Sequence, residues 1–283
     1  MTVSAPGPEP MPLPGWCMLV RADNPGPMTL DGTNTYVLRL DAGRVVVVDP
    51  GPPDEEHLHA VASVAGQGEV ALVLLTHGHP DHAEGAPRFH ELTGAPVRAL
   101  DPAHCIATDE PLVAGPVEWD GAGAAAGSAA DGSGGVGSEG LAVEVLLTPG
   151  HTSDSVCFVV ESAGRRAVLT GDTVLGRGTT VVAHPDGSLA PYLDSLRQVA
   201  ALGPVTLLPG HGPVRPDAAA LAGEYLTHRE ARLVQVRRAV ADGATTAPEV
   251  VRLVYADVDE ALWPAAELSV RAQLDYLAAE SGA

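Results

Sequence analysis

The stretch Thr76-His77-Gly78-His79-Pro80-Asp81-His82 places three imidazoles and a carboxylate directly after the apolar run 70–75. A short apolar run is typical of a buried strand, so these polar groups are expected where that strand ends. His77 and His79 are two positions apart and can point the same way in an extended turn. Asp81 and His82 follow at the start of a predicted helix, so the four side chains can converge on a metal ion.

Three later apolar runs end in the same way, each with one potential metal ligand after a tight turn. They are 141–147 followed by His151, 166–169 followed by Asp172, and 205–208 followed by His211. Five of the eleven histidines of the chain fall at such positions. Open α/β sheets usually bind ligands at the carboxyl ends of their strands. The sequence therefore predicts an α/β fold with a metal site at that edge.

The first half of the chain shows further elements of this fold. Residues 28–48 predict a hairpin whose second strand is apolar throughout, as expected for a strand covered on both faces. Amphipathic patterns predict helices over 53–65 and 82–92, and a short strand is expected near 96–100. Asp49 follows the hairpin, where it either orients metal ligands or serves as a turn aspartate before Pro50-Gly51.

Composition limits the classes of function. The net charge is −20, and all sixteen basic residues are arginines, so tight nonspecific nucleic-acid binding is not expected. No apolar run is long enough to span a bilayer, and residues 1–16 lack the pattern of a secretory signal. Three cysteines without metal or redox spacing suit reduced thiols. We therefore expect no membrane association and a cytoplasmic location.

The chain is expected to contain three parts. They are a flexible N-terminal arm (1–16), a catalytic domain (17–216) and a small all-α domain (217–283). Within the catalytic domain, residues 119–140 consist mostly of Gly, Ala, Ser and Asp and predict a mobile surface insertion. The last part predicts helices over 218–241, 247–255 and 264–279, with a capping box at Thr246–Glu249. We expect this domain to serve packing or homodimerisation before nucleic-acid contact.

The ligand spacing resembles the metallo-β-lactamase superfamily over about 28–214. The resemblance implies that His77, His79 and His151 bind one metal ion, that Asp81, His82 and His211 bind a second, and that Asp172 bridges them. Nitrogen and oxygen ligands without thiolate suit two zinc ions per chain, with manganese or iron as alternatives.

The flanking segments 24–36, 171–180 and 225–230 are similar to the β-lactamase-like protein 2 family. That resemblance implies an αββα sandwich followed by a winged-helix-like domain. It also implies either single-strand endoribonuclease activity, as in the animal member, or thioesterase activity on carrier-bound polyketides, as in fungal members. The chain departs from the family in its insertion and in ending soon after the last helix.

Together these features predict a dinuclear zinc-dependent hydrolase that uses a metal-bridging hydroxide to cleave an ester-type bond. The substrate is either a phosphodiester of single-stranded RNA or a small-molecule ester or thioester. Asp81 and Asp172 are the predicted catalytic residues, and the candidate substrate contacts are Arg177, His184 and Tyr192. Alternatives are a thioesterase or glyoxalase-II-like hydrolase and, from another class, a DNA-binding regulator with a metal-sensing domain. The histidines outside the motif are expected at the surface: His57, His59, His90 and His104.

Overall fold

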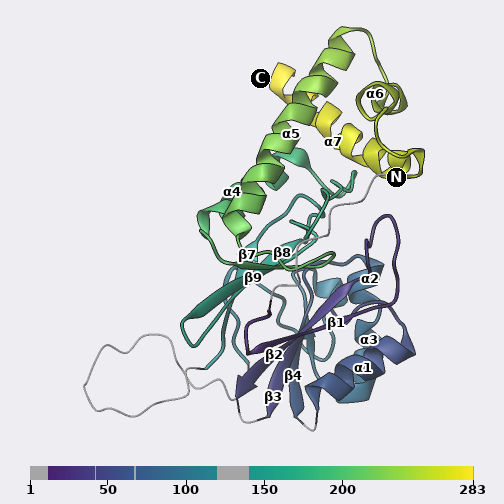
Figure 1. Cartoon of the computed structure of the whole chain (residues 1–283). Helices are drawn as coiled ribbons and strands as arrows, with labels where there is room; N and C mark the ends of the chain where they lie inside the picture. Colours follow the sequence, from purple (N-terminus) through teal and green to yellow (C-terminus); the bar gives the residue numbers. More distant parts are fainter. Residues whose placement is uncertain (1–11, 42, 67, 120–139, 283) are drawn as a thin grey trace, which may run out of the picture.

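The computed structural model describes residues 12–41, 43–66, 68–119 and 140–282. A two-sheet sandwich forms the lower part of the molecule, and a group of helices stands above it (Figure 1). The predicted mobile insertion and most of the predicted N-terminal arm lie outside the described residues. Trp16, which the sequence placed in that arm, is buried against the sandwich core.

The first sheet has the strand order β1-β2-β3-β4-β5. Its strands are β1 (Cys17–Arg21), β2 (Asn34–Asp41), β3 (Arg44–Val48), β4 (Glu69–Leu74) and β5 (Val97–Arg98). The predicted hairpin is the antiparallel pair β2–β3, whereas β3, β4 and β5 run parallel to one another. The helices on this side are α1 (Glu55–Ala65), α2 (Pro80–Ala83) and α3 (Ala86–Thr93).

The second sheet has the strand order β10-β9-β8-β7-β6. Its strands are β6 (Gly115–Pro116), β7 (Ala142–Leu147), β8 (Val156–Ser162), β9 (Arg165–Gly171) and β10 (Thr206–Pro209). The pairs from β6 to β9 are antiparallel, and β10 joins β9 in parallel. Helix α4 (Leu189–Ala201) packs on the outer face through the fully buried Leu196.

Besides the cluster under α4, two apolar clusters hold the sandwich together. Between the sheets, Leu38 and Val46 of the first sheet share one buried cluster with Phe158 and Leu169 of the second. Outside the first sheet, Phe89 of α3 packs in a separate cluster with the outward-facing side chains of that sheet. This order of helix, sheet, sheet and helix confirms the predicted αββα sandwich.

The C-terminal part consists of helices. They are α5 (Ala218–Ala241), α6 (Ala247–Val254) and α7 (Trp263–Gly282), with a short 3-10 helix at Glu260–Leu262 before α7. The predicted capping box is confirmed, because the Glu249 carboxylate accepts hydrogen bonds from the backbone N–H groups of Thr245 and Thr246. Between residues 217 and 282 the structure places no strand, and the start of α5 packs on α4 through Tyr225.

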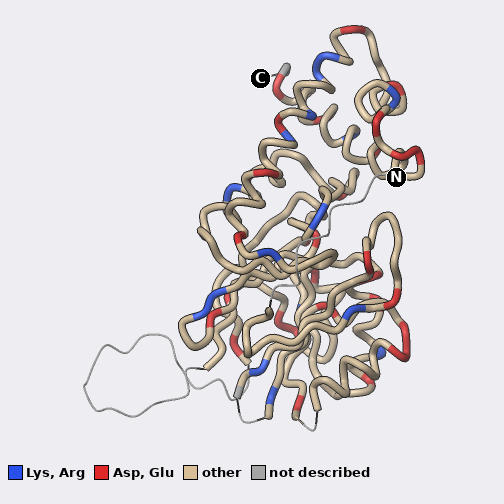
Figure 2. Tube along the Cα trace, viewed as in Figure 1, with Lys and Arg blue, Asp and Glu red and all other residues tan. Residues whose placement is uncertain are grey.

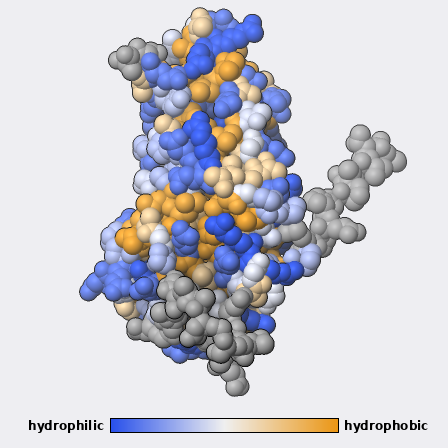
Figure 3. Space-filling view, turned by 90° about the vertical axis from the view of Figure 1, so that its left-hand side faces the viewer, coloured by the Kyte–Doolittle hydropathy of each residue, from blue (hydrophilic) through white to orange (hydrophobic). Residues whose placement is uncertain are grey.

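The sandwich and the C-terminal helices share one apolar region of the molecular surface (Figure 3). On one face, apolar side chains gather in a band across the middle of the molecule and continue over the helices above it (Figure 3). Within the described residues, no helix combines the length and the apolar character needed to cross a bilayer.

Two local expectations were wrong. The predicted helix over 82–92 is divided into α2 and α3, and at the division Gly85 N–H donates to the carbonyl of Gly51 outside the helix. A Cβ at Gly85 would approach that carbonyl oxygen to 2.7 Å, so the close contact requires glycine. His57 is buried rather than at the surface, and its Nε2 lies 3.0 Å from Thr35 Oγ1.

Asn34 ties the first sheet to the turn that follows β10. Its Nδ2 donates to the carbonyls of Pro209 and Gly212, and the whole side chain is buried. We predict that Asn34→Ala lowers the free energy of unfolding by about 1–3 kcal/mol, because a buried carbonyl loses its partner. Urea denaturation measures the loss. Gln198→Ala, at an exposed position on α4, is the control, and equal stability of the two variants would contradict the prediction.

Candidate metal centre

Seven potential metal ligands meet at one edge of the sandwich, where strands of both sheets end. Two ligands follow β9 and β10, one follows β7, and four lie in the segment after β4: Asp172, His211, His151, His77, His79, Asp81 and His82. They form two groups, and within each group the ligand atoms lie within 4.8 Å of one another. The structure therefore brings together every residue that the sequence predicted as a ligand.

The first group contains His77, His79, His151 and Asp172. His79 Nδ1 lies 3.1 Å from His151 Nε2, so these two nitrogens face a common point. His77 Nδ1 lies 3.1 Å from Thr76 Oγ1, and its buried Nε2 has no hydrogen-bond partner. Buried polar atoms rarely lack a partner, and a cation would supply one here.

The second group contains Asp81, His82 and His211. His82 Nε2 lies 3.2 Å from His211 Nε2, and His211 Nε2 lies 3.1 Å from Asp81 Oδ2. Both imidazoles are almost completely buried. Three donor atoms of two residue types therefore face one another at distances suited to a shared ion.

Asp172 stands between the two groups. Its Oδ2 lies 3.7 Å from His151 Nε2, whereas its Oδ1 lies 3.4 Å from His211 Nε2 and 3.5 Å from His82 Nε2. Oδ1 is buried without a hydrogen-bond partner. This placement favours a bridging role for Asp172. The donor set, with unpartnered nitrogen and oxygen atoms and no thiolate, fits divalent cations such as zinc.

Asp49 supports the centre from behind. Its Oδ2 lies 2.9 Å from His82 Nδ1 and accepts a hydrogen bond from Thr76 Oγ1, while its Oδ1 accepts from Thr76 N–H. Such a carboxylate orients an imidazole and leaves its other nitrogen for the metal. Of the two roles that the sequence left open for Asp49, the geometry favours the orientation of ligands.

Sequence reasoning missed several residues that position the ligands from distant segments. Thr33 Oγ1 donates to Asp81 Oδ2, and Asn24 in turn binds the backbone and hydroxyl of Thr33. On the other side, His151 Nδ1 lies 2.6 Å from the carbonyl oxygen of Val181. Only the similarity of segment 24–36 to a known family hinted at the first pair, and nothing in the sequence hinted at the second.

Close packing explains one glycine beside the ligands. A Cβ added to Gly210 would lie 2.7 Å from His82 Cε1 and 2.8 Å from Asp172 Oδ1. Any side chain at this position would displace ligands of both groups. Glycine before His211 therefore lets the β10 turn approach the centre.

Comparison with known proteins agrees with this geometry. Residues 28–211, more than half of the chain, match the family model of the metallo-beta-lactamase superfamily. The chain belongs to the metallo-beta-lactamase superfamily. Residues 246–281 match the model of the beta-lactamase associated winged helix domain. The helical part is thus a recognised companion of this superfamily's catalytic fold.

Individual relatives cover both parts of this superfamily member. An "Atrochrysone carboxyl ACP thioesterase" of Aspergillus fumigatus is 33% identical, with 83% of this chain and 72% of that protein covered. A "Beta-lactamase-like protein 2 homolog" of Caenorhabditis elegans is 30% identical, with 90% and 81% covered. A solved metallo-beta-lactamase family protein from Thermus thermophilus has the same fold, with a TM-score of 0.73, 24% identity and 94% of both chains covered.

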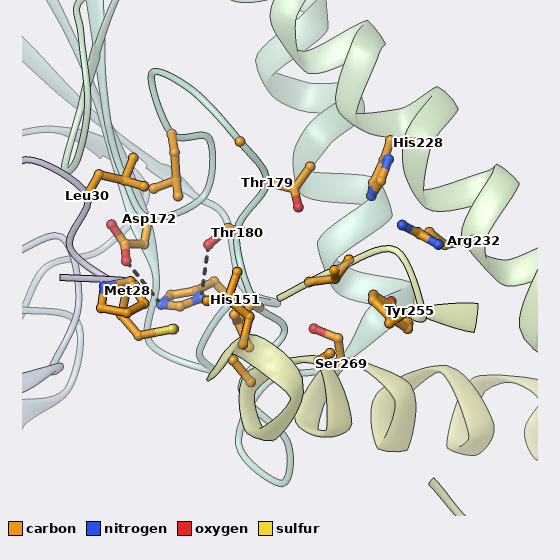
Figure 4. A pocket seen from close by; sticks show the side chains of 18 of the residues that line it. Met28, Leu30, His151, Asp172, Thr179, Thr180, His228, Arg232, Tyr255 and Ser269 are labelled. Atoms are coloured by element: carbon orange, nitrogen blue, oxygen red, sulfur yellow. Dashed lines mark hydrogen bonds and ion pairs between the residues drawn. The ribbon is translucent and has the colours of Figure 1, made fainter. Parts of the chain in front are cut away.

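A cavity of about 370 Å³ opens on this metallo-beta-lactamase centre and extends to the helical part (Figure 4). His151 and Asp172 lie at one end. Of the predicted substrate contacts, only Arg177 lines this cavity, and it is paired with Asp31. His184 instead pairs with Asp275 at the surface. Tyr192 is fully buried and its hydroxyl donates to the carbonyl of Thr173, so the structure places it away from any substrate.

The ligands also shift one another's protonation. Burial lowers the pKa of His82, but the charges of Asp172 and Asp81 outweigh burial and raise it well above its usual value. Burial also lowers the pKa of His211, but the charge of Asp172 outweighs burial and raises this pKa to about 9. Burial raises the pKa of Asp81, yet His82 and His211 lower it to about 2. In the metal-free protein the second group therefore holds protons at neutral pH.

This protonation predicts how zinc stabilises the protein at different pH values. A raised folded-state pKa stabilises the metal-free fold fully below about pH 6.5, and this contribution is lost as pH rises through about 9. Zinc needs the same imidazoles deprotonated. We therefore expect the zinc-induced rise in Tm to be larger at pH 8.5 than at pH 6.5, as measured by scanning calorimetry. An equal or larger rise at pH 6.5 would contradict this account.

Asp49→Asn tests the orientation of the second group. The amide has one oxygen in place of two, so its NH2 group would face either Thr76 N–H or the donors at the other position. We therefore expect zinc affinity to fall about 10–100-fold. Chelator competition measures the affinity, and circular dichroism checks the fold. Asp194→Asn, on the exposed side of α4, is the matched control. Unchanged zinc affinity in a folded Asp49 variant would show that the carboxylate has no orienting role.

Proposed function

We propose that this protein is a dinuclear zinc-dependent hydrolase whose substrate is a thioester or ester with an apolar acyl group. The supporting observation is the cavity beside Asp172 and His151. Its walls are mainly apolar side chains, among them Met28, Leu30, Val181, Val258, Leu262 and Ala266. A volume of about 370 Å³ lies in the range of small-molecule sites.

The chain's own residues prepare the reaction. His77, His79 and His151 would hold one cation, Asp81, His82 and His211 a second, and Asp172 would contact both. Divalent cations in such a site lower the pKa of water and polarise the oxygen of a scissile carbonyl. Asp81 is the more exposed carboxylate of the two, with 27% of its side chain accessible against 11% for Asp172.

Asp81 is also the best-placed group for proton transfer. Thr33 donates a hydrogen bond to one oxygen of its carboxylate, and 27% of the Asp81 side chain is accessible. A carboxylate at the solvent side of the centre can receive the proton of the attacking water and pass it to the leaving group. A thiolate leaving group needs little such help, which suits a thioester substrate.

Cleavage of single-stranded RNA is the second candidate. Resemblance to the β-lactamase-like protein 2 family favours it, and the name of one curated relative is consistent with that family. A polyanion, however, would meet a chain of net charge −20 with acidic side chains scattered over both parts (Figure 2). The apolar part of the cavity wall suits an acyl chain, so we place the thioester first.

Parallel assays test this proposal. Zinc-loaded protein is incubated with an aliphatic acyl thioester of N-acetylcysteamine, the matching oxygen ester and a single-stranded RNA, and bound zinc is quantified. We expect two zinc ions per chain and turnover of the thioester. Asp172→Ala should lower kcat/KM by more than about a hundredfold, because loss of a direct ligand should exceed the 10–100-fold typical of its outer partners.

The outcomes separate the candidates. RNA cleavage that Asp172→Ala abolishes, without thioester turnover, would replace the leading proposal by the second one. Asp186→Ala is the control, since Asp186 lies outside the centre and bonds only Ser153 among the contacts of its side chain described by the structure. No bound zinc and no difference between wild type and Asp172→Ala would refute a metal-dependent hydrolase.

A further inference from the structure

The cavity has two chemically different ends. Asp172 and His151 lie at the metal end, whereas His228 and Arg232 of α5 lie at the opposite end with Tyr255 near them, and Ser269 lies between the two ends (Figure 4). His228 and Arg232 are four residues apart on one helix, so they are neighbours on its surface. The far end is therefore built entirely by the helical part of the chain.

Positive charge is concentrated at this far end. Arg232 lines the cavity there, Arg229 lines it beside Thr180, and Arg177, which is paired with Asp31, lines it nearer the centre. Among the described residues of the lining, the one carboxylate is that of the metal ligand Asp172. Burial, followed by repulsion from Arg229 and Arg232, lowers the pKa of His228. In a chain of net charge −20, such a local excess of cations is unusual and favours an anionic group.

Arg232 is held in place mainly by uncharged partners. Its guanidinium lies over the Tyr255 ring at 4.5 Å and donates to the carbonyl of Val254 and to Gln235 Oε1. The carboxylate nearest to it, that of Asp257, is 3.9 Å away and largely exposed. A guanidinium oriented by neutral partners keeps its charge for a ligand and loses little entropy when it binds one.

We propose that His228 and Arg232 form a subsite for an anionic group, a carboxylate or a phosphate, on a substrate whose scissile thioester lies at the metal end and whose apolar part fills the space between. This inference rests on the proposed hydrolase function and adds a second recognition element to it. A carboxylate would belong to the far end of the acyl group, whereas a phosphate would belong to the thiol side, as in a phosphopantetheine arm.

Three thioesters of matched acyl length distinguish these sources. The first is a neutral acyl thioester of N-acetylcysteamine, the second carries a terminal carboxylate on the acyl chain, and the third joins the neutral acyl group to 4′-phosphopantetheine. We expect one anionic substrate to have the highest kcat/KM, mainly through a lower KM. Its identity names the source of the anion.

Arg232→Gln tests the subsite directly. The preference for the anionic over the neutral thioester should fall about tenfold to a hundredfold, as for a lost charge-assisted hydrogen bond. Arg238→Gln, on an 84% exposed side chain of the same helix, should leave both activities unchanged. An equal loss for neutral and anionic substrates would assign Arg232 a structural role only and overturn the proposal.

Two additions keep the test decisive. Arg232 also links α5 to α6, so His228→Gln serves as the second variant if Arg232→Gln lowers Tm strongly.

Calorimetry measures how tightly zinc-loaded protein binds the dicarboxylate product and its monocarboxylate analogue, and this measurement needs no turnover. Tight, Arg232-dependent binding without thioester hydrolysis would refute the proposed function but retain the subsite, whereas hydrolysis without any anion preference would refute the subsite alone.

Discussion

The centre depends on one constraint, which is that seven polar ligands converge where the strands of two sheets end. Among the described residues, His77 Nε2 and Asp172 Oδ1 are buried with no hydrogen-bond partner, and the neighbouring carboxylates raise the pKa of His82. Buried polar atoms without partners destabilise a fold. The sandwich tolerates them because close apolar packing between the sheets fixes the strand ends, and Asp49, Thr33 and Asn34 fix the turns that follow them.

The helical part contributes to the centre as well as to the cavity. Arg229 of α5 lies over the Tyr192 ring and donates to the carbonyl of Thr180, next to Val181, whose own carbonyl lies against His151. Ser269 of α7 accepts a hydrogen bond from Val182 N–H. One loop thus contacts a metal ligand on one side and two C-terminal helices on the other. Docking of these helices therefore fixes both the far wall of the cavity and the orientation of His151.

The sequence predicted most of the centre because its signals are local. Each ligand stands within a few residues of an apolar strand, and small Gly and Pro neighbours mark each turn, so chain order alone indicated the convergence. The division at Gly85 was missed because it arises from contact with the backbone of Gly51, far away in the chain. The burial of His57 on α1 was missed for the same reason, since its partner Thr35 belongs to β2.

The cavity could not be predicted, because only His228 of its far wall lies in a segment, 225–230, that the sequence singled out. Val258 and Leu262 lie between two predicted helices, Ala266 reads as an ordinary position of the last one, and Arg232 reads as one arginine on an amphipathic helix. Their role depends on how α5 and α7 dock onto the loop after Asp172.

That docking also explains how an acidic protein can accept an anion. Salt screens the charges of the outer surface beyond a Debye length of about 8 Å under physiological conditions. Interactions between charged groups inside a partly buried cavity are screened far less. A small anionic ligand that has entered the cavity is therefore attracted by the arginines that line it. A polyanion that remains outside meets the negative surface first, so the same charge pattern favours a small anionic ester over a long nucleic acid.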